Sequence, residues 1–268
     1  MENEVENVPI LRITDEGKSH SSDTVAREFP LTLILNGQEL VTLLCSPKDL
    51  NYLAIGFLTS EGFLKNKDDI KKIIVDDRRG VVRVETTKDL AQEPLFKRLI
   101  TSGCGRGASF YSAADAEGWL KVESQMTISA PNVIALVQKL QRHSQVFRTT
   151  GGVHSAALCD TTNILVFSED IGRHNAIDKI FGECLVRDIP TDNRILITSG
   201  RISSEILLKI AKRNVPILIS RSAPTDLGLR LANDLAVTLV GFVRGKRMNV
   251  YTNEWRITTR AEEKPMTA

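Results

Sequence analysis

A cysteine enclosed by glycines is the residue of this chain best suited to nucleophilic chemistry. Cys104 lies in the run TSGCGRG, residues 101–107. The glycines leave the sulfur uncrowded and allow the backbone to take positive φ. Arg106 brings a positive charge that favours the thiolate, which is the reactive form of cysteine. The run predicts a reactive thiol; the alternative is a flexible glycine loop that carries an inert one.

Arginines recur in a second pattern. Each of three predicted strand-to-helix loops holds a small residue followed by arginine, as Gly172-Arg173, Gly200-Arg201 and Ser220-Arg221. Loops that follow parallel strands meet at the carboxyl edge of the sheet, where ligands bind in open α/β folds. Helix N-termini and arginines bind phosphate or carboxylate there. The three loops together predict a phosphorylated or otherwise anionic ligand.

A fourth basic cluster falls at the bend between the last two predicted strands. It consists of Phe242, Val243, Arg244, Gly245, Lys246 and Arg247. Its cations suit a pyrophosphate and its aromatic ring suits stacking on a base, although a solvated hairpin tip would have the same composition. His174, directly after Arg173, is a further candidate, with a structural hydrogen-bonding role as the alternative. Asp170 is expected to cap the helix that follows it.

The order of elements predicts three parts. Residues 1–28 are polar and aperiodic and are expected to form a flexible arm, so that regular structure begins at Phe29. Residues 29–124 are expected to form a small α+β domain that ends in the reactive cysteine loop. It would hold a hairpin turning at Asn36-Gly37 and a helix capped by Ser46. A second hairpin spans 73–84, a short helix 94–100, and a linker 109–129.

Residues 125–268 are expected to form an α/β domain. A helix is predicted over 131–143 and a strand over 154–159, followed by three strand-then-helix units whose strands are 164–168, 195–198 and 217–219. Two strands, 237–243 and 248–251, would close the domain. This alternation predicts a mixed, largely parallel sheet sandwiched by helices.

Composition restricts the class of protein. The 268 residues are 42% hydrophobic with a net charge of +2, which is ordinary for a globular chain and gives no bulk attraction to nucleic acid or membrane. We find no secretory signal and no apolar run of membrane-spanning length. The four cysteines lie far apart without zinc-ligand spacing. We therefore expect a cytoplasmic protein without structural disulfides or a permanently bound metal.

Seven short motifs in order resemble one family over roughly residues 29–253. They are LxxLAxGFLxxEG (50–62), SGCG (102–105), TGGVH (150–154), EDIGRHNA (169–176), SGRIS (199–203), SAPT (222–225) and FVRGKR (242–247). Together they resemble FdhD, the formate dehydrogenase accessory sulfurtransferase family.

The resemblance implies a sulfur relay. Such proteins accept persulfide sulfur from a cysteine desulfurase and pass it to the metal of a molybdenum or tungsten bis-molybdopterin guanine dinucleotide cofactor, which formate dehydrogenase requires. The persulfide cysteine falls on Cys104, and the cofactor-binding segment on 242–247. We further expect Arg173, His174, Arg201 and Arg221 to contact the cofactor. The larger domain would have a cytidine-deaminase-like fold.

One position departs from the family. Some members carry Cys-x-x-Cys at the reactive loop, whereas this chain has Gly107 at the second position. Cys104 must therefore act alone or use a thiol from elsewhere. The number of subunits stays open, with a homodimer as one option.

Two other functions compete with the sulfur relay. A non-covalent carrier of the molybdenum cofactor would share every anion-binding feature, and only Cys104 separates the two. A zinc-dependent nucleobase deaminase needs H-x-E and P-C-x-x-C. Neither motif occurs in this sequence, which argues against the deaminase.

Overall fold

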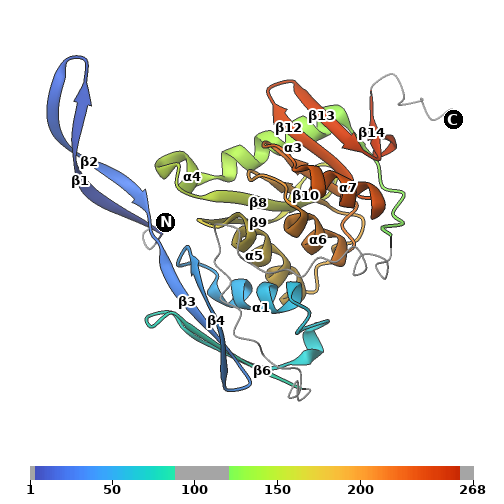
Figure 1. Cartoon of the computed structure of the whole chain (residues 1–268), viewed down its shortest axis with the longest axis horizontal. Coiled ribbons are helices and arrows are strands. Elements are labelled where there is room, and N and C mark those ends of the chain that lie inside the picture. The colour runs from blue at the N-terminus through green and yellow to red at the C-terminus, as the bar shows by residue number, and fades with distance from the viewer. Residues whose placement is uncertain (1–3, 88–120, 260–268) are drawn as a thin grey trace.

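The chain forms a mixed α/β structure, as expected. The computed structural model describes residues 4–87 and 121–259. A four-stranded sheet with one helix forms a small unit, and a six-stranded sheet between helices forms a larger one (Figure 1). The predicted helix 94–100 and the Cys104 run lie outside the described residues.

The elements follow the order expected from the sequence, with additions at the N-terminus. The first part contains β1 (Val5–Thr14), β2 (Gly17–Ala26), β3 (Phe29–Leu35), β4 (Gln38–Cys45), α1 (Leu50–Ser60), the 3-10 helix η1 (Lys67–Asp69), β5 (Ile70–Asp76) and β6 (Val81–Thr86). The second part contains β7 (Ile128–Ser129), α3 (Ala130–His143), α4 (Gln145–Thr150), β8 (His154–Cys159), β9 (Ile164–Asp170), α5 (Arg173–Val186), β10 (Ile195–Thr198), α6 (Ser204–Lys212), β11 (Ile217–Ser220), α7 (Asp226–Asp234), β12 (Thr238–Arg244), β13 (Arg247–Thr252), the 3-10 helix η2 (Glu254–Arg256) and β14 (Ile257–Thr258).

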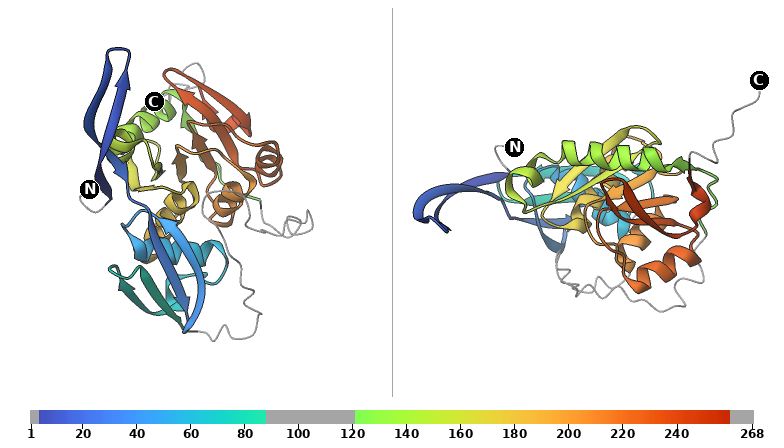
Figure 2. Two further views of the ribbon diagram at one scale, coloured as in Figure 1. Left: turned by 60° about the vertical axis from the view of Figure 1, so that its left-hand side comes forward. Right: turned by 90° about the horizontal axis from the view of Figure 1, so that it is seen from above.

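Regular structure begins earlier than predicted. Strands β1 and β2 pair along their whole length as an antiparallel hairpin, from Val5 opposite Ala26 to Thr14 opposite Gly17. The hairpin extends away from the rest of the molecule (Figures 1 and 2). Its side chains are mostly exposed on both faces, so the sequence lacks the apolar alternation by which a half-buried strand is recognised.

The small unit confirms both predicted hairpins and corrects one helix start. Asn36 (φ 48°) and Gly37 (φ 82°) form the expected turn between β3 and β4. Helix α1 begins at Leu50 with Asp49 as its cap residue. Ser46 is therefore not the cap: its hydroxyl accepts a hydrogen bond from the Ile171 N–H, 125 residues along the chain.

The larger unit is built on a sheet in the order β13-β12-β11-β10-β8-β9. Strands β10, β11 and β12 are parallel, whereas β8 is antiparallel to both β10 and β9. Strand β9 therefore runs in the same direction as β10, β11 and β12. The predicted mixed sheet and the predicted helix over 131–143 are both confirmed. The sheet is not largely parallel in its pairing, however, because the pairs β12–β13, β10–β8 and β8–β9 are antiparallel.

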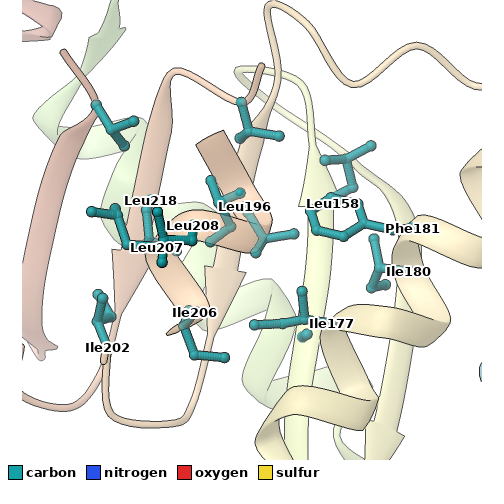
Figure 3. Close-up of a cluster of buried hydrophobic side chains, with 14 of the residues drawn as sticks. Leu158, Ile177, Ile180, Phe181, Leu196, Ile202, Ile206, Leu207, Leu208 and Leu218 are labelled. Carbon is teal, nitrogen blue, oxygen red and sulfur yellow. The ribbon is translucent and has the colours of Figure 1, made fainter. Parts of the chain in front are cut away.

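Alternate strand residues face two helical layers. On one face, β-strand side chains such as Leu158, Leu196 and Leu218 pack against helices α5, α6 and α7 (Figure 3). On the other face, Ala157, Ile197 and their neighbours pack against α3. The expected linker is also corrected in part, because Val122 is buried in the first of these cores.

Helices α1 and α5 cross at two glycines and join the two units. A Cβ atom added at Gly56 would lie 1.7 Å from the carbonyl oxygen of Asp178, and one at Gly182 would lie 1.9 Å from that of Tyr52. Only glycine lets the two backbones approach this closely. Helix α5 is consequently buried on nearly all sides, between the sheet and α1.

We predict that Gly182→Ala will lower the free energy of unfolding by about 3 kcal/mol, the upper end of the usual cost of overpacking. The added methyl group would meet backbone atoms of α1, which cannot rotate away. Urea unfolding measures the change. Asn51→Ala on α1 is the control and should stay within about 0.5 kcal/mol of the parent protein. Equal stability of the Gly182 variant and the parent would contradict the close crossing.

Candidate functional site

The three arginine loops lie at one edge of the large sheet, as the sequence predicted. Strands β9, β10 and β11 run in one direction and each is followed by a helix, so their loops emerge together. Strand β12 runs the same way and delivers the 242–247 turn to that edge. We call this edge, formed by the loops after β9, β10 and β11 and by the β12–β13 turn, the carboxyl edge.

Hydrogen bonds connect neighbouring loops of the carboxyl edge. Ser199 Oγ accepts the N–H of Ser155 at 3.0 Å, which ties the β10 loop to β8. Ser220 Oγ donates to the carbonyl oxygen of Gly200 at 2.6 Å, which ties β11 to the β10 loop. These bonds fix the loops relative to one another.

The turn after β12 is tied to the same series of loops. The Phe242 N–H donates to the Ser222 carbonyl at 3.1 Å, and Arg244 Nε donates to the Arg221 carbonyl at 3.2 Å. The carboxyl edge is thus connected from β8 to β12.

The predicted cations differ in exposure. Arg173 is half-buried against Gly200, where an added Cβ would lie 2.9 Å from Arg173 Cβ. Arg221 is also half-buried, with the amide oxygen of Gln141 3.1 and 3.2 Å from its terminal nitrogens when that amide is correctly oriented. Arg201 is exposed. So are Arg244, Gly245, Lys246 and Arg247. The edge therefore has two half-buried and several exposed positive charges.

Phe242 has an unusual backbone conformation. Its φ is 52°, in the left-handed region that bulky residues rarely adopt, and it lies where the β12–β13 register shifts. Arg244 lies over its ring at 5.6 Å from the centroid. Val243, in contrast, is buried in the sheet core and anchors the turn instead of reaching a ligand. Strain of this kind, of order 1–3 kcal/mol, persists where the surroundings hold it and often marks functional segments.

Two histidines beside Arg173 are held in the neutral form. Burial, together with the nearby charges of Lys209 and Arg173, lowers the pKa of His174 to about 3. Burial and Arg173 likewise lower the pKa of His154, whose Nδ1 lies 3.3 Å from Ser199 Oγ. Both rings can donate and accept hydrogen bonds at neutral pH without adding charge.

A buried ion pair positions the loop that carries Arg173. Asp170 and Lys179 are 0% and 1% exposed, with 2.7 Å between Oδ2 and Nζ. Asp170 also accepts the N–H groups of Ser46 and Gly172. Asp170 is therefore not the helix cap that the sequence suggested, since Gly172 occupies that position. It links the small unit to the start of α5.

The cysteines within the described residues are buried and therefore unreactive. Cys45, Cys159 and Cys184 are buried, and burial raises the pKa of each thiol to about 12. They are fully protonated at neutral pH, so none of the three can replace the thiol missing at Gly107.

Sequence reasoning missed several residues of the site. Lys179 belongs to α5, a helix of mixed composition in which even Asn175 and Asp178 are buried, so no pattern in the sequence marked it as a buried charge. Ser199 directly precedes the noted Gly200-Arg201 pair. Glu205 lies in the first turn of α6 and resembles an ordinary helix-start acid, yet its carboxylate is 3.5 Å from His174 Nε2.

Three further observations concern a cleft, membrane-spanning helices and metal-ligand clusters among the described residues. A cleft of about 660 Å³ beside Arg27, Phe29 and Leu50 contains none of the predicted site residues. Residues 4–87 and 121–259 hold no helix with the length and apolar character to cross a membrane. The same ranges hold no cluster of three or more His, Cys, Asp or Glu side chains that could bind a metal ion.

The fold and the carboxyl edge define a mixed α/β protein in which several arginine-bearing loops gather at one edge of a six-stranded sheet. Comparison with known proteins identifies the group more closely. The model of the FdhD/NarQ family matches residues 26–258, and the chain belongs to this family.

Relatives match along nearly their whole lengths. The sulfur carrier protein FdhD of Bacillus pumilus (strain SAFR-032) is 48% identical over 88% of this chain and 91% of its own. That of Staphylococcus aureus (strain MRSA252) is 43% identical over 93% and 95%. A crystal structure from Desulfotalea psychrophila, described as a formate dehydrogenase accessory protein, superposes with a TM-score of 0.77 at 26% identity. It covers 95% of this chain and 99% of that one.

We predict that Lys179→Met will destabilise the protein by about 3–5 kcal/mol, because the Asp170 carboxylate would be left buried without its cation. Chemical denaturation provides the measurement. Lys67→Met removes an ion pair between half-exposed or exposed side chains, Lys67 and Asp188, and should cost no more than about 1 kcal/mol. Adding Asp170→Asn to Lys179→Met should restore part of the loss. A single variant as stable as the parent would show that the pair is not required.

His174 should make the fold sensitive to acid. Because its pKa falls from 6.5 to about 3 on folding, its contribution is complete above pH 6.5. It declines as the pH falls from 6.5 towards 3, by at most about 1.4 kcal/mol per unit, because only the unfolded chain takes up the proton. Unfolding at several pH values should therefore give a flatter profile for His174→Asn. His20→Asn, on the exposed hairpin, should keep the parent slope; an unchanged slope for His174→Asn would contradict the prediction.

Proposed function

We propose that this protein is a sulfurtransferase that serves formate dehydrogenase. Cys104 accepts persulfide sulfur from a cysteine desulfurase and delivers it to the metal of bis-molybdopterin guanine dinucleotide, bound at the carboxyl edge. The observation that carries this proposal is the convergence of three arginine loops and the 242–247 turn on one edge, in a chain whose relatives are sulfur carrier proteins.

The charge of the edge suits the proposed substrate. Each guanine dinucleotide arm carries a pyrophosphate, and arginine binds phosphate through parallel hydrogen bonds. Strands β9 and β12 are four places apart in the sheet, which corresponds to roughly 19 Å between their ends. An extended dinucleotide arm can follow such an edge, with Arg244, Lys246 and Arg247 at one end and Arg173 at the other. The ring of Phe242 would stack on a base.

The first transfer follows from ordinary persulfide chemistry. The Cys104 thiolate attacks the terminal sulfur of the donor persulfide, R–S–SH. A bond forms between Cys104 Sγ and that sulfur, the donor S–S bond breaks, and the electron pair leaves on the desulfurase thiolate. One thiol is enough for this exchange, so Gly107 does not prevent it.

The finer fold assignment supports the same picture. We assign the larger unit, with its six-stranded mixed sheet between helices, to a cytidine-deaminase-like domain whose ligand edge is the carboxyl edge. We assign sulfur acceptance to the segment that follows the small unit, and cofactor binding to residues 125–268.

Two sets of substitutions should separate the two roles. Cys104→Ala should still bind GDP but fail to activate the dehydrogenase, because only the sulfur carrier is lost. Arg244→Ala with Arg247→Ala should lose at least about tenfold in GDP affinity, because charge-assisted bonds are lost, and still accept sulfur on Cys104. Arg12→Ala on the hairpin is the control. Calorimetry and dehydrogenase activation are the measurements, and full activation by Cys104→Ala would refute the catalytic assignment.

Mass spectrometry distinguishes transfer from non-covalent carriage. After incubation with desulfurase and cysteine, the peptide that contains Cys104 should gain the mass of one sulfur atom. An unmodified thiol under these conditions, with cofactor binding intact, would favour a carrier that never handles sulfur covalently.

A further inference from the structure

One carboxylate lies among the cations of the carboxyl edge. Glu205 belongs to the first turn of α6, directly after the Gly200-Arg201 loop, and its side chain is 36% exposed. Its one ion-pair contact within the described residues is His174, at 3.5 Å. Because the pKa of His174 is about 3, this imidazole is neutral and does not balance the carboxylate.

A negative charge at this position opposes the binding of phosphates. An acid in the first turn of a helix does stabilise the helix, by about 0.3–1 kcal/mol. The first turn of α7 has such an acid as well, but Asp226 is paired with Arg230 and is 82% exposed. Glu205 instead faces a histidine inside the cluster formed with Arg173, which points to a partner that donates hydrogen bonds.

We propose that Glu205 is a specificity residue for the 2-amino-4-oxopyrimidine edge, which guanine and pterin share. This proposal rests on the function proposed above and adds the group that is recognised. The ring N–H and the 2-amino group of such an edge donate two parallel hydrogen bonds, and a carboxylate accepts both. The adjacent carbonyl oxygen needs a donor, and Arg173 and the neutral His154 lie beside Glu205's partner His174.

The surroundings favour an uncharged heterocycle over phosphate at this end of the edge. His154 is oriented by Ser199 and is kept neutral by burial and by Arg173. Gly200 leaves room for Arg173, because any Cβ there would press on the Arg173 side chain. Of the exposed cations, only Arg201 lies in the loop that precedes Glu205, whereas the cluster of Arg244, Lys246 and Arg247 lies at the far end, on β12 and β13. Phosphate and ring are thus assigned to different parts of the site.

Two matched pairs of ligands test whether Glu205 recognises this edge and whether guanine or pterin supplies it. GDP and IDP differ only in the 2-amino group, and so do 6-hydroxymethylpterin and its 2-desamino counterpart. Calorimetry with the full chain should show roughly tenfold or greater preference for the amino member of one pair. Glu205→Gln should abolish that preference. Glu183→Gln, on α5 beside Arg187, is the matched control and should keep it.

The outcomes separate this inference from the function on which it rests. Preference within the GDP pair identifies guanine at Glu205, and preference within the pterin pair identifies pterin. Absence of preference in both pairs, or preference that survives Glu205→Gln, overturns the inference while GDP binding through Arg244 and Arg247 stands. No binding of GDP by the parent protein overturns the proposed function itself.

Discussion

The position of α5 is the constraint on which the rest of the structure depends. This helix lies between the large sheet and α1, and it can do so because Gly56 and Gly182 let the two backbones meet. Its buried polar groups are paired: Lys179 with Asp170 at the end of β9, and Asp178 with Lys209 of α6 and with Ser60 of α1, across the contact. Close packing brings these charges out of water, and their partners on both units make that burial tolerable.

The residues at the start of α5 connect the α1–α5 contact to the carboxyl edge. Asp170 ends β9, Gly172 caps α5, and Arg173 is the first residue of the helix. Ser46 bonds to both Asp170 and Ile171, so the small unit holds the loop that presents Arg173. The carboxyl edge of the larger unit is thereby held partly by contacts from the smaller unit.

Local signals in the sequence were sufficient for much of the fold and for the placement of the arginines. The Asn36-Gly37 turn needs positive φ, and the alternation of strands and helices places the loops at one edge. Long-range contacts were not visible: Ser46 looks like a helix cap until Asp170, 124 residues away, is known to bind it. The β1–β2 hairpin was missed because backbone pairing, without an apolar face, defines it. Glu205 became notable only once its neighbours were known.

The burial of three thiols has a consequence for the fidelity of sulfur traffic. Sulfane sulfur can be transferred to any accessible thiolate near a donor, so such thiolates compete for it. Cys45, Cys159 and Cys184 are sealed within apolar packing and remain protonated. These three thiols therefore do not compete as sulfur acceptors, and oxidants in solution cannot reach them either.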